Sequence, residues 1–145
     1  MQIKVHKLED DAKLPFRKNP EDAGLDFFSL FHMILLPGES AICKTGITVE
    51  IPAGYCAQMW PKSKNDHLVG AGIIDAGYQG EVLVKIFNPT SKTLVIKPGD
   101  GIAQMVLVSI ITPEVLEVSS EEIHQKKSAR GKTGGIFSQS FKIEV

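Results

Sequence analysis

Residues 72–81 read Gly-Ile-Ile-Asp-Ala-Gly-Tyr-Gln-Gly-Glu, which places a carboxylate between a short apolar run and a glycine turn. A carboxylate at a strand end, with glycines beside it, is well placed to activate a water molecule by accepting its proton. Asp75 is therefore a candidate catalytic base, with Tyr78 close behind it. A plain hairpin, in which Asp75 is only a turn residue, fits the same sequence.

Two other segments place cations beside hydroxyl groups or glycines. In residues 61–64, two lysines flank Ser63, and ammonium and hydroxyl groups both bind phosphate oxygens. Residues 125–135 are basic and rich in glycine, and backbone N–H groups freed by glycine can wrap a polyphosphate. This segment is not a P-loop, because residues 130–133 lack the upstream glycine. Taken singly, the first segment is explained as well by a solvated basic turn, and the second by a disordered terminus.

The elements that must position these residues are strands. Val82, Val84 and Ile86 fall on one face at period two. Residues 102–111 are mostly apolar, and their β-branched content and flanking prolines favour a buried strand over a buried helix. Shorter β-branched runs and turn signals occupy much of the rest: runs at 48–51 and 93–96, turns at 37–39, 52–54, 88–90 and 98–100. This spacing predicts an all-β sandwich, jelly roll or barrel.

One brief helix is expected, over residues 119–123. Ser119 or Ser120 can act as its N-cap, and two glutamates follow in the first turn.

Composition limits the classes of protein to which the chain can belong. Its 145 residues fit one domain, and 43% hydrophobic residues can form a core without disulfides. With 16 basic and 17 acidic residues, the net charge of −1 excludes a basic nucleic-acid arm. No apolar run approaches the ~18 residues of a membrane span, and the N-terminus lacks a signal-peptide core. We expect a cytoplasmic protein with no nucleic-acid or membrane partner.

Cysteine and histidine predict no metal centre. Cys43 and Cys56 are too few for a disulfide scaffold and form no CxxC pair, so both are expected to be small buried residues. His32, His67 and His124 match no metal-ligand spacing and are expected to be structural or on the surface.

The order of the segments resembles the five-motif series of the homotrimeric dUTPase family (dUTP diphosphatases). The corresponding segments are residues 23–29, 61–63, 72–81, 99–104 and 130–138. The third and fourth match closely, the first matches well, and the second and fifth match in part. The resemblance implies a jelly-roll β-barrel or sandwich over residues 1–124 and a flexible glycine-rich arm over residues 125–145 that closes over the active site. It also implies a homotrimer with active sites between its subunits.

The resemblance further implies hydrolysis of dUTP to dUMP and pyrophosphate, assisted by Mg²⁺. Asp75 would activate the water that attacks the α-phosphate, and Tyr78 would lie against the deoxyribose. The backbone around Gly72 and Ile73 would read the edge of the uracil, because cytosine presents the reversed hydrogen-bonding pattern.

The remaining implied roles concern the phosphates, the metal and the arm. Asp26 would hold the Mg²⁺ through water or organise the site. The other implied substrate-binding residues are Lys62, Ser63 and Gln104 at the phosphates, and Arg130, Phe137 and Ser138 on the arm.

The chain departs from the family pattern at several positions. Lys62 replaces the usual arginine, so bidentate phosphate binding is lost. Lys64 replaces a glycine, and Gly101 stands where an arginine is common. Ile136 falls where an aromatic ring normally stacks on uracil, unless Phe137 takes that role by a shift of one residue. These changes concern affinity and base preference, and they leave the water-activating acid in place.

Two alternatives to a dUTP hydrolase remain open. A dCTP deaminase relative shares the Asp-x-Gly-aromatic-x-Gly element but needs a glutamate on the following strand, where this chain has Lys85. A non-catalytic trimer that binds nucleotides or a regulatory partner would explain the altered second and fifth motifs. Asp75 argues against it, because a pure binder has no need of a water-activating carboxylate.

Overall fold

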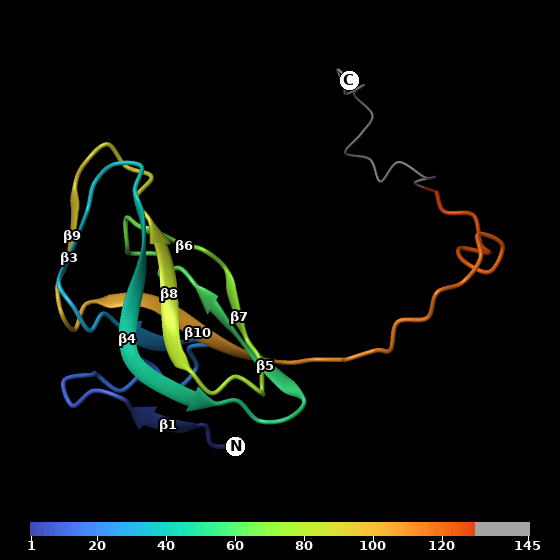
Figure 1. The fold of residues 1–145 in the computed structure, drawn as a ribbon, viewed down its shortest axis with the longest axis horizontal. Coiled ribbons are helices and arrows are strands. Elements are labelled where there is room, and N and C mark those ends of the chain that lie inside the picture. The colour runs from blue at the N-terminus through green and yellow to red at the C-terminus, as the bar shows by residue number, and fades with distance from the viewer. Residues whose placement is uncertain (130–145) are drawn as a thin grey trace. The chain divides into compact units, whose positions relative to one another are not determined.

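The strands predicted from the sequence are present and form two packed sheets. The computed structural model describes residues 1–129, and its first compact unit, Met1–Ile111, holds all the strands of that range. One sheet has the order β1 (Lys4–Lys7), β4 (Ser40–Glu50), β8 (Glu81–Phe87), β6 (Leu68–Val69). The other has the order β2 (Leu25–Phe28), β10 (Gly101–Ser109), β5 (Tyr55–Trp60), β7 (Gly72–Ile74). Strands β3 (Met33–Leu35) and β9 (Leu94–Ile96) form a separate ribbon at one end of the unit (Figure 1).

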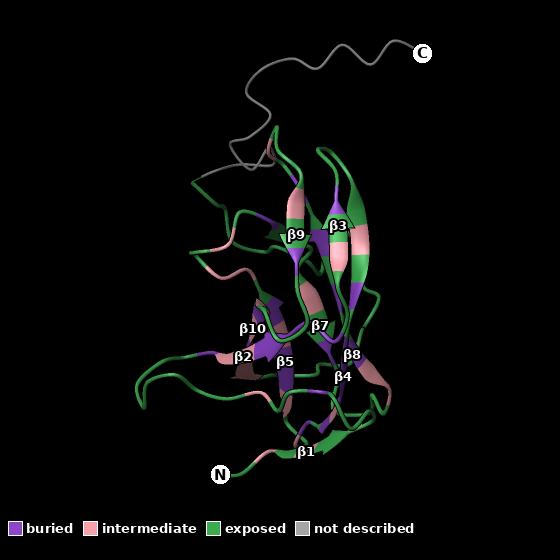
Figure 2. Cartoon of the chain, turned by 90° about the vertical axis from the view of Figure 1, so that its left-hand side faces the viewer, coloured by how far each residue is buried: buried purple, intermediate pink, exposed green. Residues whose placement is uncertain are grey.

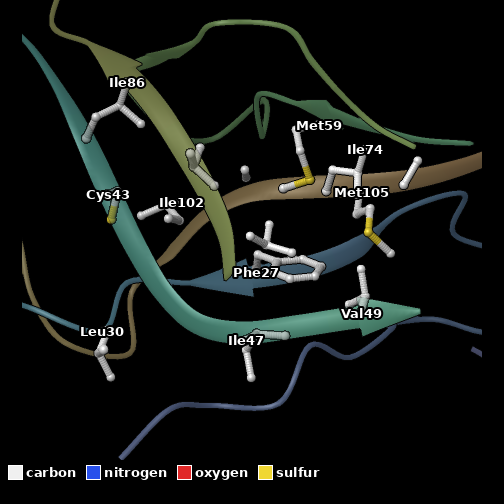
Figure 3. Close-up of a cluster of buried hydrophobic side chains, with 14 of the residues drawn as sticks. Phe27, Leu30, Cys43, Ile47, Val49, Met59, Ile74, Ile86, Ile102 and Met105 are labelled. Carbon is white, nitrogen blue, oxygen red and sulfur yellow. The ribbon is translucent and has the colours of Figure 1, made fainter. Parts of the chain in front are cut away.

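The inner faces of the two sheets make the hydrophobic core. On β8, buried Val82, Val84 and Ile86 alternate with exposed residues, as the period-two pattern predicted. They pack in one cluster with Phe27 of β2 and Met105 of β10, both about 1% exposed. Figure 3 shows such side chains filling the space between the sheets, and Figure 2 shows the buried residues gathered where the sheets face one another. The predicted all-β, jelly-roll type of fold is confirmed.

Strand β5 fixes where the chemically interesting residues lie. Its register pairs Trp60 with Gln104 of β10 on one side, and Ala57 with Ile74 of β7 on the other. Lys62 therefore follows one end of β5, whereas Asp75, directly after Ile74, lies toward the other end. At about 3.3 Å per residue, this register separates Asp75 from Lys62 by roughly 20 Å along the strand.

One alternative and one local expectation do not hold. Asp75 is not the turn of a hairpin, because β7 before it pairs with β5 in one sheet, whereas β8 after it pairs with β4 and β6 in the other. Residues 119–123 form a single turn instead of a helix. The Ser119 N–H and hydroxyl donate to the Glu122 carboxylate at 3.0 and 2.9 Å, and these bonds lower the pKa of Glu122. Glu122 thus binds the free Ser119 N–H, but a single turn has too few backbone bonds to persist as a helix.

Both cysteines are buried, as expected, at 0% exposure for Cys43 and 5% for Cys56. Burial raises the pKa of the Cys43 thiol, whose sulfur lies 3.1 Å from the Ser29 hydroxyl. The second unit, residues 112–145, contains no helix or strand as far as residue 129. Within the described range, no helix has the length and apolarity needed to cross a membrane.

Candidate active site

Four of the predicted phosphate and metal residues meet in one open pocket of about 320 Å³, here called the Lys62 pocket. Its lining residues are Lys18, Asp22, Ala23, Gly24, Asp26, Lys62, Ser63, Lys64 and Gln104. Strand register explains the meeting, because Gln104 pairs with Asp26 of β2 on one side and with Trp60 of β5 on the other. The loop that carries Lys62 and Ser63 leaves β5 directly after Trp60.

Lys62 and Asp26 form an ion pair across the floor of the Lys62 pocket. The Lys62 ammonium contacts Asp26 Oδ1, and their side chains are only 13% and 16% exposed. The lysine stem runs over Gly101, at 3.5 Å from the position that a Cβ there would take. The charge of Lys62 is therefore matched by a carboxylate within the chain itself.

Gln104 is held in place from two sides. Its Nε2 donates to the Pro61 carbonyl at 3.0 Å, which leaves the second N–H of the amide for a ligand. On the other side, a Cβ on Gly24 would overlap Gln104 Oε1 and lie 2.9 Å from Gln104 Cβ. Position 24 therefore requires glycine, and the absent side chain is what lets β2 lie so close to Gln104.

The loop after β5 is fixed to β10 by Asn65, which sequence reasoning missed, and by His67. The Asn65 N–H donates to the Lys62 carbonyl at 3.1 Å and closes a turn around Ser63 and Lys64. Asn65 Nδ2 donates to the Gly101 carbonyl at 2.8 Å, and buried His67 Nε2 donates to the Ile102 carbonyl at 2.7 Å. His67 is structural, as predicted. The sequence feature that could have identified Asn65 is its position at the end of a tight turn.

A second pocket, of about 240 Å³, lies beside β7 and is here called the Tyr78 pocket. Its lining residues are Met59, Gly70, Gly72, Ile73, Ile74, Tyr78, Glu81, Val82, Leu83 and Val84. It brings together the predicted base- and sugar-binding residues Gly72, Ile73 and Tyr78. Strand β7 is the edge of its sheet, so backbone N–H and C=O groups on its free side have no strand partner among residues 1–129.

Tyr78 is bent back over the turn that carries it. Its hydroxyl donates to the Glu81 carbonyl at 2.6 Å, and its N–H donates to the Asp75 carbonyl at 3.0 Å. A Cβ on Gly80 would lie 2.6 Å from the Tyr78 hydroxyl and 2.8 Å from Cζ, so only glycine allows this ring position. The ring remains 42% exposed and is open to a ligand.

Asp75 stands apart from both pockets. It is exposed, and within residues 1–129 its carboxylate makes no hydrogen bond or ion pair. The structure therefore brings Asp26, Lys62, Ser63 and Gln104 together and brings Gly72, Ile73 and Tyr78 together, but it does not join the two groups. The predicted arm residues Arg130, Phe137 and Ser138 lie outside the described residues.

No group of three or more His, Cys, Asp or Glu side chains in residues 1–129 is arranged to hold a metal ion. Mg²⁺ usually binds through one or two carboxylates, several waters and the phosphates of its substrate. The one carboxylate of β2 in the Lys62 pocket, Asp26, uses Oδ1 for Lys62, and within residues 1–129 its Oδ2 makes no hydrogen bond or ion pair. This donor set fits a magnesium ion carried mainly by a polyphosphate.

Comparisons with known proteins agree with this geometry. A family model described as dUTPase matches residues 10–135. Deoxyuridine 5'-triphosphate nucleotidohydrolase of Oryza sativa subsp. japonica is 41% identical over 120 residues, which cover 80% of this chain and 70% of the relative. The enzyme of the same name from Fowlpox virus (strain NVSL) is 36% identical over 141 residues, covering 92% and 97%.

Solved structures of dUTPases are also similar to this chain. A mutant dUTPase from phage phi11 of S. aureus, in which a structural Mg(II) ion is coordinated, superposes with a TM-score of 0.78 at 31% identity. That match covers 86% of this chain and 99% of the phage chain. A dUTPase of Staphylococcus bacteriophage 80alpha with dUpNHpp has a TM-score of 0.75 at 30% identity, covering 83% and 98%.

Proposed function

The chain belongs to the dUTPase family, and from that premise we propose that it hydrolyses dUTP to dUMP and pyrophosphate through the residues of the two pockets. The observation that carries this proposal is the meeting of Asp26, Lys62, Ser63 and Gln104 in one pocket. Those residues come from three separate sequence segments, each singled out for phosphate or metal chemistry. Their meeting is the arrangement that a triphosphate site requires.

The base would bind along the free edge of β7. An N–H of this edge can donate to uracil O4 and a C=O can accept from N3–H, whereas cytosine reverses both groups. A mismatch would leave buried polar groups unpaired, which is a strong means of discrimination. The exposed ring of Tyr78 would lie against the deoxyribose, where a 2′-hydroxyl would clash.

Asp75 would act as the general base. Its exposed carboxylate accepts a proton from a water molecule as the water oxygen forms a bond to the α-phosphorus. The bond from that phosphorus to the oxygen bridging to the β-phosphate breaks, and pyrophosphate leaves. Ser63, Lys62 and the free N–H of Gln104 would hold the phosphate oxygens so that water and leaving group lie in line.

A Mg²⁺ ion would be held mainly by the triphosphate, and Asp26 would be the residue of the Lys62 pocket that helps to hold it through water. When bound, the ion supplies charge neutralisation and alignment of the phosphates. The ion pair with Lys62 supports the other predicted role of Asp26 as well, because it fixes the lysine in the pocket. Closure by Arg130, Phe137 and Ser138 and the cytoplasmic location both stay predictions.

The site would be completed between copies of the chain. Asp75 and Lys62 lie toward opposite ends of β5, roughly 20 Å apart along the strand, which is too far for one nucleotide α-phosphate to touch both. A symmetric homotrimer would solve this by setting the Tyr78 pocket of one copy against the Lys62 pocket of the next. This separation within one chain supports the homotrimer.

The direct test is pyrophosphate release from dUTP, dCTP, dTTP and UTP with Mg²⁺, by the wild type and by Asp75→Asn. We expect release from dUTP alone, lowered about 10²–10⁴-fold in the variant, as for loss of a general base. Ammonia release from dCTP would favour the deaminase alternative. Nucleotide binding with no turnover of any substrate would favour the non-catalytic trimer.

A further inference from the structure

The positive charge of the Lys62 pocket does not come mainly from Lys62. The pocket is lined by three lysines and two aspartates. Lys62 is already paired with Asp26, and both side chains are mostly buried, so this pair presents little net charge to a ligand. A triphosphate carries several negative charges, and its affinity depends on cations that are still unmatched.

Lys18 and Lys64 are such cations. Both line the Lys62 pocket, both are exposed, and within residues 1–129 neither ammonium makes a hydrogen bond or an ion pair. The second aspartate, Asp22, bonds elsewhere, because its Oδ2 accepts from the N–H and the side-chain amide of Asn19 at 3.0 and 2.9 Å. The Asp22 carboxylate is therefore hydrogen-bonded within its own loop and does not pair with Lys18.

The backbone that carries Lys64 is fixed although its side chain is free. The turn from Lys62 to Asn65 is closed by a backbone hydrogen bond of 3.1 Å. Asn65 Nδ2 ties the end of this turn to the Gly101 carbonyl of β10 at 2.8 Å. Because the Cα of Lys64 is held at the rim, reaching a phosphate requires the ordering of one side chain and no movement of the loop.

We propose that Lys18 and Lys64 are further substrate-binding residues of this chain, which together take the charge of the triphosphate, and that Lys62 with Asp26 forms the neutral floor beneath it. The identity of the ligand as a nucleoside triphosphate rests on the proposed function. The charge argument itself holds for any polyphosphate.

The test is a calorimetric titration with inorganic tripolyphosphate, followed by steady-state kinetics with dUTP. Lys18→Gln and Lys64→Gln should each weaken tripolyphosphate binding and raise KM about tenfold, the usual worth of a hydrogen bond to a charged group. kcat should change little. Lys64→Arg, which keeps the charge, should bind nearly as the wild type does. Lys92→Gln, which removes a lysine outside the pocket, should leave both quantities unchanged.

Two further readouts separate charge from structure. Added salt should weaken tripolyphosphate binding more in the wild type than in a Lys18→Gln/Lys64→Gln double variant, because exposed charges are screened. Affinity for dUMP should fall less than affinity for dUTP in both single variants, since fewer phosphate charges are involved.

The inference is overturned if both single variants bind tripolyphosphate as the wild type does, or if Lys64→Arg loses as much binding as Lys64→Gln. An effect from only one of the lysines overturns the assignment of the other. Failure of the wild type to hydrolyse dUTP would reject the proposed function alone, because the tripolyphosphate titration still decides the role of the two lysines.

Discussion

The Lys62 pocket and the Tyr78 pocket differ in what holds their residues in place. In the Lys62 pocket, side chains are fixed by contacts between β2, β10 and the loop after β5: the ion pair of Lys62 with Asp26 is largely buried, and Gln104 donates to the Pro61 carbonyl. In the Tyr78 pocket, the functional groups are backbone atoms of an edge strand and one half-exposed ring. Asp75, beyond that pocket, has no side-chain partner within residues 1–129.

Because of this difference, substitutions in the two pockets should have different effects. In the Lys62 pocket, substitution of the mostly buried residues should change affinity and stability together, whereas substitution of the exposed residues should change affinity alone. The Tyr78 pocket depends on backbone placement and, in the proposed homotrimer, on a neighbouring copy to complete it, so its substitutions should change selectivity and rate with little effect on folding. Each substitution below is chosen to separate these two behaviours.

The largest effect on affinity is expected from a negative charge placed in the Lys62 pocket. Ser63 is exposed there, so Ser63→Glu should fold normally and repel the triphosphate. Because opposing like charges costs several kcal/mol, affinity for a non-hydrolysable dUTP analogue should fall at least about a hundredfold. Deoxyuridine, which has no phosphate, should bind as before, and Ser91→Glu on the exposed turn before β9 is the control. An equal loss of deoxyuridine binding would contradict the assignment of the phosphates and the base to two separate pockets.

The next effect is on stability and concerns the ion pair. Asp26→Ala leaves a mostly buried ammonium without its partner, so the free energy of unfolding should fall by about 2–3 kcal/mol. Adding Lys62→Met should recover most of that loss, which urea unfolding of the full double-mutant cycle can measure. Lys4 and Glu50 form the exposed counterpart, with side chains 82% and 63% accessible, and Lys4→Met should have no measurable effect. Equal effects of the two pairs would show that burial in the Lys62 pocket adds nothing.

A third comparison uses Gly24 of the Lys62 pocket and Gly80, which lies against Tyr78. Gly24→Ala sets a methyl group against Gln104 in a buried place, so stability should fall by about 1–3 kcal/mol and KM should rise. Gly80→Ala presses on Tyr78, whose exposed ring can swing away. Unfolding should then change little, while discrimination between dUTP and UTP should fall. Thermal unfolding and the ratio of kcat/KM values check both, and a large loss of stability in Gly80→Ala would contradict the contrast.

The smallest effect is expected from Tyr78→Phe. It removes only the hydrogen bond to the Glu81 carbonyl, at an exposed position. Since the ring still covers the deoxyribose, KM for dUTP should change by less than about threefold. A much larger change would mean that the hydroxyl itself contacts the substrate.

Much of the fold could be predicted because alternation is a local signal. Strand β8 reads directly from Val82, Val84 and Ile86, and the buried cysteines follow from their number and spacing. The separation of β6 from β7 could not be predicted, because two short strands next to each other in sequence can pair together or join different sheets. The helix expected at 119–123 failed because a cap favours a helix only where further turns follow.

The Lys62 pocket could be predicted in part. Asp26, Lys62, Ser63 and Gln104 were found from their motifs, but their contacts depend on strand register, which no motif encodes. Asn65 and Lys18 were missed because their roles arise from the packing of loops against β10 and β2. Asp75 and Tyr78 were found from their spacing alone, and the distance of Asp75 from Lys62 emerged only with the pairing of β5.

The most direct test of a site shared between copies is complementation between two inactive variants. Asp75→Asn disables the base and Ser63→Glu disables the phosphate pocket, so each homogeneous protein should be inactive. Refolded together in equal amounts, the copies should regain about a quarter of wild-type activity, because a quarter of random neighbouring pairs join two intact halves. A mixture as inactive as its parents would contradict the account and place both halves of each site within one chain.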